Sequence, residues 1–164
     1  MNQYKLLTPG PLTTTDTVKA VMQVDHCTWD DDYKQITQRI RAQLLALGHV
    51  AEPAYTAVLM QGSGTFGVES VLTTVVGPKD KVLIAANGAY GLRMTDICRH
   101  AGVAYTLYAQ PHDQRPEAGV VAKYLAEDPH TPHVATVHGE TTRGPLTAAA
   151  AVGHVATAPG NTSN

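Results

Sequence analysis

The stretch Lys81-Val-Leu-Ile-Ala-Ala-Asn-Gly88 decides the fold class that this sequence predicts. Its apolar residues follow one another without polar alternation, which is typical of a strand that is buried on both faces of a parallel sheet. A helical pattern follows over residues 91–101, and a further apolar run covers residues 103–108. Strands that alternate with helices in this way indicate an α/β fold, a three-layer αβα arrangement with a mostly parallel sheet.

The same alternation continues on both sides of this stretch. The further segments are expected to be strands over residues 55–60 and 133–137 and helices over residues 66–76, 117–125 and 146–157. The final helix is the weakest of these predictions, because it is composed mainly of alanine.

The N-terminal part of the chain has a different character, with an arm rich in proline followed by two helical patterns. We expect a short helix N-capped by Asp16 and a longer helix that the three aspartates at residues 30–32 precede. Gly48 stands where a left-handed cap would end the longer helix. The predicted organisation is therefore an N-terminal arm with helices over residues 1–50 and the α/β domain over residues 51–164.

Composition indicates a globular protein and excludes several classes of partner. The chain has 164 residues, of which 43% are hydrophobic and 16% charged, and its net charge is -2. These values argue against disorder and provide no basic surface for nucleic acid or anionic lipid. No apolar run reaches the roughly 20 residues that span a bilayer, and no signal peptide is visible. Cys27 and Cys98 fit no metal-binding or redox spacing, so we expect reduced thiols in a cytoplasmic protein.

The glycine-rich turn Gly62-Ser-Gly-Thr65 is the strongest local signal of function. Ligands bind beyond the carboxyl ends of strands in parallel sheets, so the N–H groups and hydroxyls of this turn suit an anion such as phosphate. The spacing of Gly62, Gly64 and Gly67 also fits a dinucleotide fingerprint, but the next strand ends without the acidic residue that would hold a ribose. An ordinary strand-to-helix turn is the third interpretation.

Two further loops follow strands at the same predicted edge. Tyr90 stands between glycines and either stacks on the ring of a ligand or packs within its own loop. The loop His138-Gly-Glu-Thr-Thr-Arg-Gly144 gathers His138, Glu140, two hydroxyls and Arg143. Such loops often carry function, although a polar loop exposed to solvent is the alternative.

No metal site is expected. His130 and His133 lie among prolines and match no recognised spacing of metal ligands. The acidic run from Asp30 to Asp32 could hold a divalent cation, but its favourable interaction with a helix N-terminus explains it adequately.

Five segments carry a family resemblance when they are taken together. They are Leu7-Thr-Pro-Gly-Pro-Leu12, Cys27-Thr-Trp-Asp-Asp-Asp-Tyr33, Gln61-Gly-Ser-Gly-Thr65, Ala86-Asn-Gly-Ala-Tyr-Gly91 and His138-Gly-Glu-Thr-Thr142. The chain thereby resembles the 2-aminoethylphosphonate–pyruvate transaminases, which are class V aminotransferases. The run at residues 27–33 is the more specific marker of the phosphonate enzymes, whereas the arm and the His-Gly-Glu loop are shared widely across class V.

The resemblance implies part of the large domain of a pyridoxal-phosphate-dependent transferase of fold type I. It implies transfer of an amino group from 2-aminoethylphosphonate to pyruvate, giving phosphonoacetaldehyde and alanine, in an enzyme that is typically a homodimer. The residues that it implies for the cofactor are Ser63, Gly64 and Thr65 at the phosphate, Tyr90 on the pyridine ring and Thr141 near the phenolic oxygen. Thr8 and Gly10 match the arm that borders the substrate pocket.

Two residues that the resemblance implies are not found in this sequence. Family members carry, beyond the matching region, an Asp that pairs with the pyridine nitrogen and a Lys that binds the cofactor covalently. Here the last lysine is Lys123 and the last aspartate is Asp128. We therefore expect a truncated, inactive copy with no catalytic residues and with weak cofactor binding. The alternatives are another class V aminotransferase, of the alanine–glyoxylate or serine–pyruvate type, and a stand-alone phosphate- or nucleotide-binding module.

Overall fold

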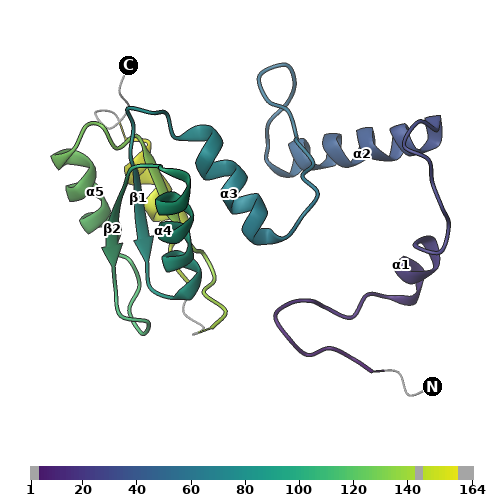
Figure 1. The fold of residues 1–164 in the computed structure, drawn as a ribbon, viewed down its shortest axis with the longest axis horizontal. Coiled ribbons are helices and arrows are strands. Elements are labelled where there is room, and N and C mark those ends of the chain that lie inside the picture. Colours follow the sequence, from purple (N-terminus) through teal and green to yellow (C-terminus); the bar gives the residue numbers. More distant parts are fainter. Residues whose placement is uncertain (1–3, 143–145, 159–164) are drawn as a thin grey trace. The chain divides into compact units, whose positions relative to one another are not determined.

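The computed structural model describes residues 4–142 and 146–158 and divides the chain into two compact units, Met1–Gln61 and Gly62–Asn164 (Figure 1). Arg143, one of the polar residues of the predicted loop, lies outside the described residues. The predicted division after residue 50 stays a prediction.

The first unit holds two helices, α1 (Asp16–Val21) and α2 (Asp31–Leu47). Asp16 is the first residue of α1 and not its N-cap, because the hydroxyl of Thr15 accepts the N–H of Val18 at 3.4 Å. A threonine oxygen at this position accepts a hydrogen bond from an N–H of the first turn, which has no acceptor within the helix.

The end of α2 also differs from the prediction. Gly48 has a φ of -78° and continues the right-handed conformation, whereas the next residue, His49, has a φ of 55°. The left-handed residue therefore stands one position later than the glycine indicates. None of the residues from Tyr4 to Gln61 is buried, so the apolar side chains of this unit have no core of their own.

The apolar run at residues 55–60 is not a strand, and that prediction is wrong. The run has no ladder partner among the described residues, and a lone extended segment cannot satisfy its backbone groups by itself. Arg41 contacts it instead. Its Nε donates to the Ala57 carbonyl at 3.0 Å, and its Nη2 donates to the Thr56 hydroxyl at 2.6 Å.

The second unit is built on a parallel sheet of β1 (Val82–Ala86), β2 (Tyr105–Ala109) and β3 (His133–Thr136). Their order in the sheet is β2-β1-β3, so β1 lies in the middle. All five residues of β1 are buried, as its uninterrupted apolar sequence predicts.

Helices cover both faces of this sheet (Figure 1). They are α3 (Gly64–Val75) and α4 (Ala89–Ala101) on one face and α5 (Ala118–Glu127) and α6 (Ala149–Ala156) on the other. This arrangement confirms the predicted three-layer α/β fold. Within residues 4–142 and 146–158, no helix has the length and apolar character that crossing a membrane requires.

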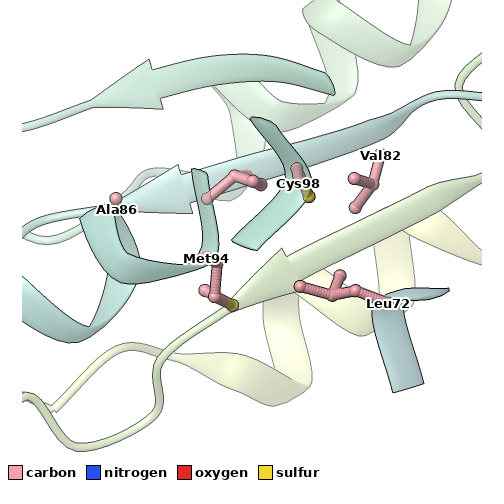
Figure 2. Close-up of a cluster of buried hydrophobic side chains, with 6 residues drawn as sticks. Leu72, Val82, Ala86, Met94 and Cys98 are labelled. Carbon is pink, nitrogen blue, oxygen red and sulfur yellow. The ribbon is translucent and has the colours of Figure 1, made fainter. Parts of the chain in front are cut away.

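Alternate residues of β1 contact opposite layers, because successive side chains of a strand point to opposite faces. The first cluster joins Val82, Ile84 and Ala86 to Leu72 of α3 and to Met94 and Cys98 of α4 (Figure 2). The second cluster joins Leu83 and Ala85 to Tyr108, Val121, Leu125 and Val152. The first cluster fixes α3 and α4 on the face that carries the candidate site.

Candidate functional site

A cavity of about 500 Å³ lies on the face of the sheet that α3 and α4 cover. It is lined by residues from the start of α3, from α4 and from the end of β3, among them Gly64, Thr65, Tyr90, Arg93, Thr136 and Val137. The connection from β1 to β2 runs in one direction along the sheet, and the connection from β2 to β3 runs back in the other direction. The crevice at such a reversal, beyond the carboxyl ends of the strands, is where open α/β sheets bind their ligands.

The start of α3 presents backbone donors at this cavity. Gly62 in the preceding turn has a φ of 154°, and a Cβ built there would lie 2.5 Å from the Phe66 ring, so the turn requires glycine. Ser63 is the N-cap, and its Oγ accepts the N–H of Phe66 at 3.2 Å. The N–H groups of Gly64 and Thr65 come before the first intrahelical hydrogen bond and have no acceptor within residues 4–142 and 146–158, so they can bind an anion.

Arg93 adds a positive charge at the same place. Its Nη1 donates to the Thr65 hydroxyl at 3.2 Å, which links α4 to the start of α3. Its guanidinium carbon lies 5.4 Å from the centroid of the Tyr90 ring, within the range of a cation–π interaction. Within the described residues Arg93 forms no ion pair, so its charge is available to a bound anion.

Sequence reasoning missed Arg93. The signal was its position three residues after Tyr90, because residues three apart lie on one face of a helix. The sequence thus shows an arginine on the same helical face as the predicted stacking aromatic. It also shows a predicted phosphate-binding turn, which calls for a positive charge.

Tyr90 is held at two points by consecutive residues of another loop. Its N–H donates to Oε2 of Glu140 at 3.0 Å, and its hydroxyl accepts a hydrogen bond from the Thr141 hydroxyl at 3.4 Å. Glu140 is only 1% exposed, and its Oε1 accepts from the Thr142 hydroxyl at 2.7 Å. The ring of Tyr90 therefore lines the cavity with its main chain and its hydroxyl both anchored.

The structure brings three of the predicted cofactor residues, Gly64, Thr65 and Tyr90, to one cavity. Ser63 adjoins them as the cap of α3, and Thr141 contacts them through the Tyr90 hydroxyl. Their roles toward a cofactor stay predictions.

Thr8 and Gly10 lie in the first unit and are both exposed. The Thr8 hydroxyl donates to the Pro11 carbonyl at 2.8 Å, a hydrogen bond within the arm itself. Their place beside a substrate stays a prediction. Among the described residues, no three His, Cys, Asp or Glu side chains gather where a metal ion would bind.

The solved structures that match this fold include aminotransferases. Pyridoxamine–pyruvate aminotransferase from Mesorhizobium loti matches 93% of this chain with a TM-score of 0.81 at 18% identity, and the match covers 38% of that chain. Ureidoglycine–glyoxylate aminotransferase from Bacillus subtilis matches 94% of this chain with the same TM-score of 0.81 at 24% identity, over 41% of its own length. These matches show that the chain has the α/β fold of part of these two proteins.

No protein-family model matches the chain, but two curated relatives that share one name are more similar to it in sequence than these structures are. A 2-aminoethylphosphonate–pyruvate transaminase of Lysinibacillus sphaericus is 56% identical over 155 residues, which are 94% of this chain and 42% of the relative. A protein of the same name from Salmonella typhimurium is 48% identical over 160 residues, 97% of this chain and 43% of the relative. The chain is thus similar to 2-aminoethylphosphonate–pyruvate transaminases over nearly all of its own length and spans less than half the length of these relatives.

Proposed function

We propose that this chain is the phosphate- and ring-binding part of a pyridoxal-phosphate-dependent 2-aminoethylphosphonate–pyruvate transaminase. The whole enzyme would move an amino group from 2-aminoethylphosphonate to pyruvate, leaving phosphonoacetaldehyde and alanine. The observation that carries the proposal is one cavity shared by the N-terminus of α3, the Arg93 guanidinium and the Tyr90 ring. The 56% identity to a relative of that name supports this choice of substrates.

The residues around the cavity fit pyridoxal phosphate. A phosphate needs donors and positive charge, which the N–H groups of Gly64 and Thr65, the Thr65 hydroxyl and Arg93 supply. A pyridine ring needs a flat apolar partner, which Tyr90 supplies. A cavity of about 500 Å³ falls within the usual range of about 300–1,000 Å³ for small-molecule sites. When bound, this cofactor supplies the electron-accepting ring that amino-group transfer requires.

Each of these groups has its own task in binding. The start of α3 and Thr65 orient the phosphate, and Arg93 neutralises part of its charge while it lies over the ring of Tyr90. Tyr90 sets the plane of the bound ring. Thr141 fixes the hydroxyl end of Tyr90 by donating to it at 3.4 Å.

The described residues of the cavity offer no group that would bind the cofactor covalently. None of the described residues that line the cavity is a lysine, and Lys123 belongs to α5, which packs on the opposite face of the sheet. We propose that the 164-residue chain holds the cofactor without a covalent bond. Borohydride reduction after incubation with pyridoxal phosphate should therefore leave no adduct confined to one lysine, and alanine should not form from pyruvate. A single-site adduct together with alanine formation would contradict this.

The binding test uses deoxypyridoxine 5'-phosphate, which lacks the aldehyde and so cannot react with lysines. Equilibrium dialysis against the 164-residue chain should show saturable binding at one site. Arg93→Gln should weaken it by about 10- to 100-fold, because a hydrogen bond to a charged group contributes about 1.5–3 kcal/mol. Arg99→Gln is the matched control, because Arg99 lies on the same helix but pairs with Asp96 at 2.7 Å. Failure to saturate, or an equal loss in both variants, would remove the support for this site.

A chimera tests the proposed substrates. Residues 1–158 of this chain would replace the matching segment of the Lysinibacillus sphaericus relative, to which the identity is 56%. The chimera should form alanine from pyruvate with 2-aminoethylphosphonate as donor. Preference for another amine donor would favour a different class V reaction.

The proposal also covers the oligomeric state of the protein and its location in the cell. By the family resemblance we propose a homodimer in the cytoplasm that acts on small amine and keto acid substrates. Sedimentation of the purified chain and of the chimera tests the dimer, and fractionation of cells that express the chain tests its location.

A further inference from the structure

We propose that Glu140 is a positioning residue that caps α4 from another loop and thereby holds the Tyr90 ring in place for the cofactor. This inference rests on the proposed function for its ligand, but the contact that it invokes lies within this chain.

The N-terminus of α4 lacks a cap of its own. Its N-cap residue, Gly88, has no side chain to accept a hydrogen bond from the first turn. The Tyr90 N–H, at the second helical position, donates instead to Oε2 of Glu140 at 3.0 Å. An N-cap side chain ordinarily accepts from this position or the next, so Glu140 takes over that function from 50 residues away in sequence.

The backbone at Gly88 is shaped to admit this carboxylate. A Cβ built at Gly88 would lie 2.5 Å from Cδ and 2.7 Å from Oε2 of Glu140. Any larger residue at position 88 would push the carboxylate away from the helix. The Glu140 carboxylate therefore matches this position in shape as well as through its hydrogen bond.

A buried carboxylate must be compensated, because its desolvation is costly. Glu140 is 1% exposed and is compensated by the Tyr90 N–H, by the Thr142 hydroxyl at 2.7 Å and by the positive end of the α4 dipole. Moving Glu140 would leave a buried charge without partners. The contact between Glu140 and the Tyr90 N–H therefore has one favourable arrangement, and this arrangement sets the position of Tyr90.

The loop that carries Glu140 is itself anchored. The Thr147 N–H donates to the His138 carbonyl at 2.8 Å, and Gly139 forms a bridge to Leu146. The next residue after Glu140, Thr141, donates to the Tyr90 hydroxyl. Two consecutive residues thus hold the main chain and the hydroxyl of the same tyrosine.

The test has a readout that needs no ligand. Amide hydrogen exchange followed by NMR on the 164-residue chain should show the Tyr90 N–H protected. Glu140→Ala should raise its exchange rate at least tenfold. Glu140→Gln should keep most of the protection, because an amide oxygen still accepts from Tyr90 and the Thr142 hydroxyl can accept from the amide nitrogen. Glu127→Ala, an exposed glutamate at the end of α5, should change nothing.

Ligand binding then separates positioning from general structure. Glu140→Ala should weaken deoxypyridoxine 5'-phosphate about as much as Tyr90→Ala does, and the double variant should add little to either loss. Inorganic phosphate should bind all of these variants within twofold of the unchanged chain, because the start of α3 and the Arg93 side chain are both retained. If Glu140→Ala fails to fold, Gly88→Ala takes its place, because the added Cβ would displace the Glu140 carboxylate, and Glu140→Gln remains the conservative variant.

Two outcomes would overturn the proposal. One is a Tyr90 N–H whose exchange is the same in Glu140→Ala as in the unchanged chain. The other is an equal loss of phosphate and of deoxypyridoxine 5'-phosphate, which a merely structural residue would produce. If the unchanged chain binds neither compound, the proposed function fails, whereas the exchange measurement still decides whether Glu140 holds Tyr90.

Discussion

Gly91 of α4 packs directly on Ala86 at the end of β1, and a Cβ built at Gly91 would lie 2.5 Å from the Cβ of Ala86 and 2.9 Å from its Cα. This close approach brings the first turn of α4, with Tyr90, against the carboxyl end of the central strand. Glycine is needed here for space, since the obstructing Cα belongs to the backbone and cannot rotate away.

Gly91→Ala should therefore destabilise the second unit. Overpacking at such a site costs about 1–3 kcal/mol. Urea denaturation followed by circular dichroism measures the loss. Gly153→Ala in α6 is the control, because a Cβ there meets nothing within 4 Å, and it should be neutral or raise stability by up to about 1 kcal/mol. Equal midpoints for the two variants would contradict the close helix–strand contact.

Ile84→Ala should reveal how much stability the first cluster supplies. Ile84 is 0% exposed at the centre of the central strand, so its truncation leaves a cavity and should cost about 2–5 kcal/mol. Val71→Ala on α3 is the matched control, because Val71 is 56% exposed and should change stability by less than about 0.5 kcal/mol. A similar denaturation midpoint for both variants would show that the cluster is not packed as described.

The pair of Lys81 and Asp128 should make stability depend on pH. Lys81 donates to Asp128 at 2.7 Å and the His130 N–H donates at 3.0 Å, and these hydrogen bonds hold the pKa of the Asp128 carboxyl below its usual value. A pKa that is lower in the folded state stabilises above the unfolded value of about 3.9, and this stabilisation is lost as the pH falls through the lowered pKa.

Asp128→Asn should consequently lower the melting temperature at pH 7 and make progressively less difference as the medium is acidified below about pH 4. Asp96→Asn, which breaks an exposed pair within one turn of α4, serves as the control. Melting curves between neutral and acidic pH measure both. A difference for Asp128→Asn that stays constant with pH would show that the ion pair is not its cause.

The two thiols should react at very different rates. Cys27 is exposed, whereas Cys98 is 0% exposed in the first cluster, and burial raises the pKa of its thiol. The thiolate is the reactive form, so a raised pKa and lack of access both slow the reaction. A chromogenic disulfide reagent should label one thiol of the native chain quickly and the second only in denaturant. Rapid labelling of a native Cys27→Ser variant would contradict the burial of Cys98.

The sequence of the second unit predicts most of its architecture because its signals are local. The uninterrupted apolar run at residues 82–86 requires burial on both faces, and the helical patterns around it supply the covering layers. The same logic failed at residues 55–60, where the pattern is equally apolar but no partner strand lies among the described residues. A strand depends on a neighbour that its own sequence does not specify.

The candidate site, too, could be predicted only in part from the sequence. The glycine-rich turn at Gly62 to Thr65, which we propose binds phosphate, and the aromatic at Tyr90 are indicated by the sequence, because glycine, hydroxyl and ring chemistry can be recognised residue by residue. Their meeting at one cavity depends on the parallel register of β1 and β3 and on the packing of α3 against α4.

By itself the sequence therefore determined the α/β layers, the helix that begins at the glycine-rich turn and the resemblance of its motifs to one family. Only the tertiary structure decided that Arg93 would reach Thr65 across 28 residues and that Glu140 would cap the helix of Tyr90 across 50. Periodicity and turn chemistry act over a few residues, whereas these contacts exist because parallel strands bring their carboxyl ends to one edge of the sheet.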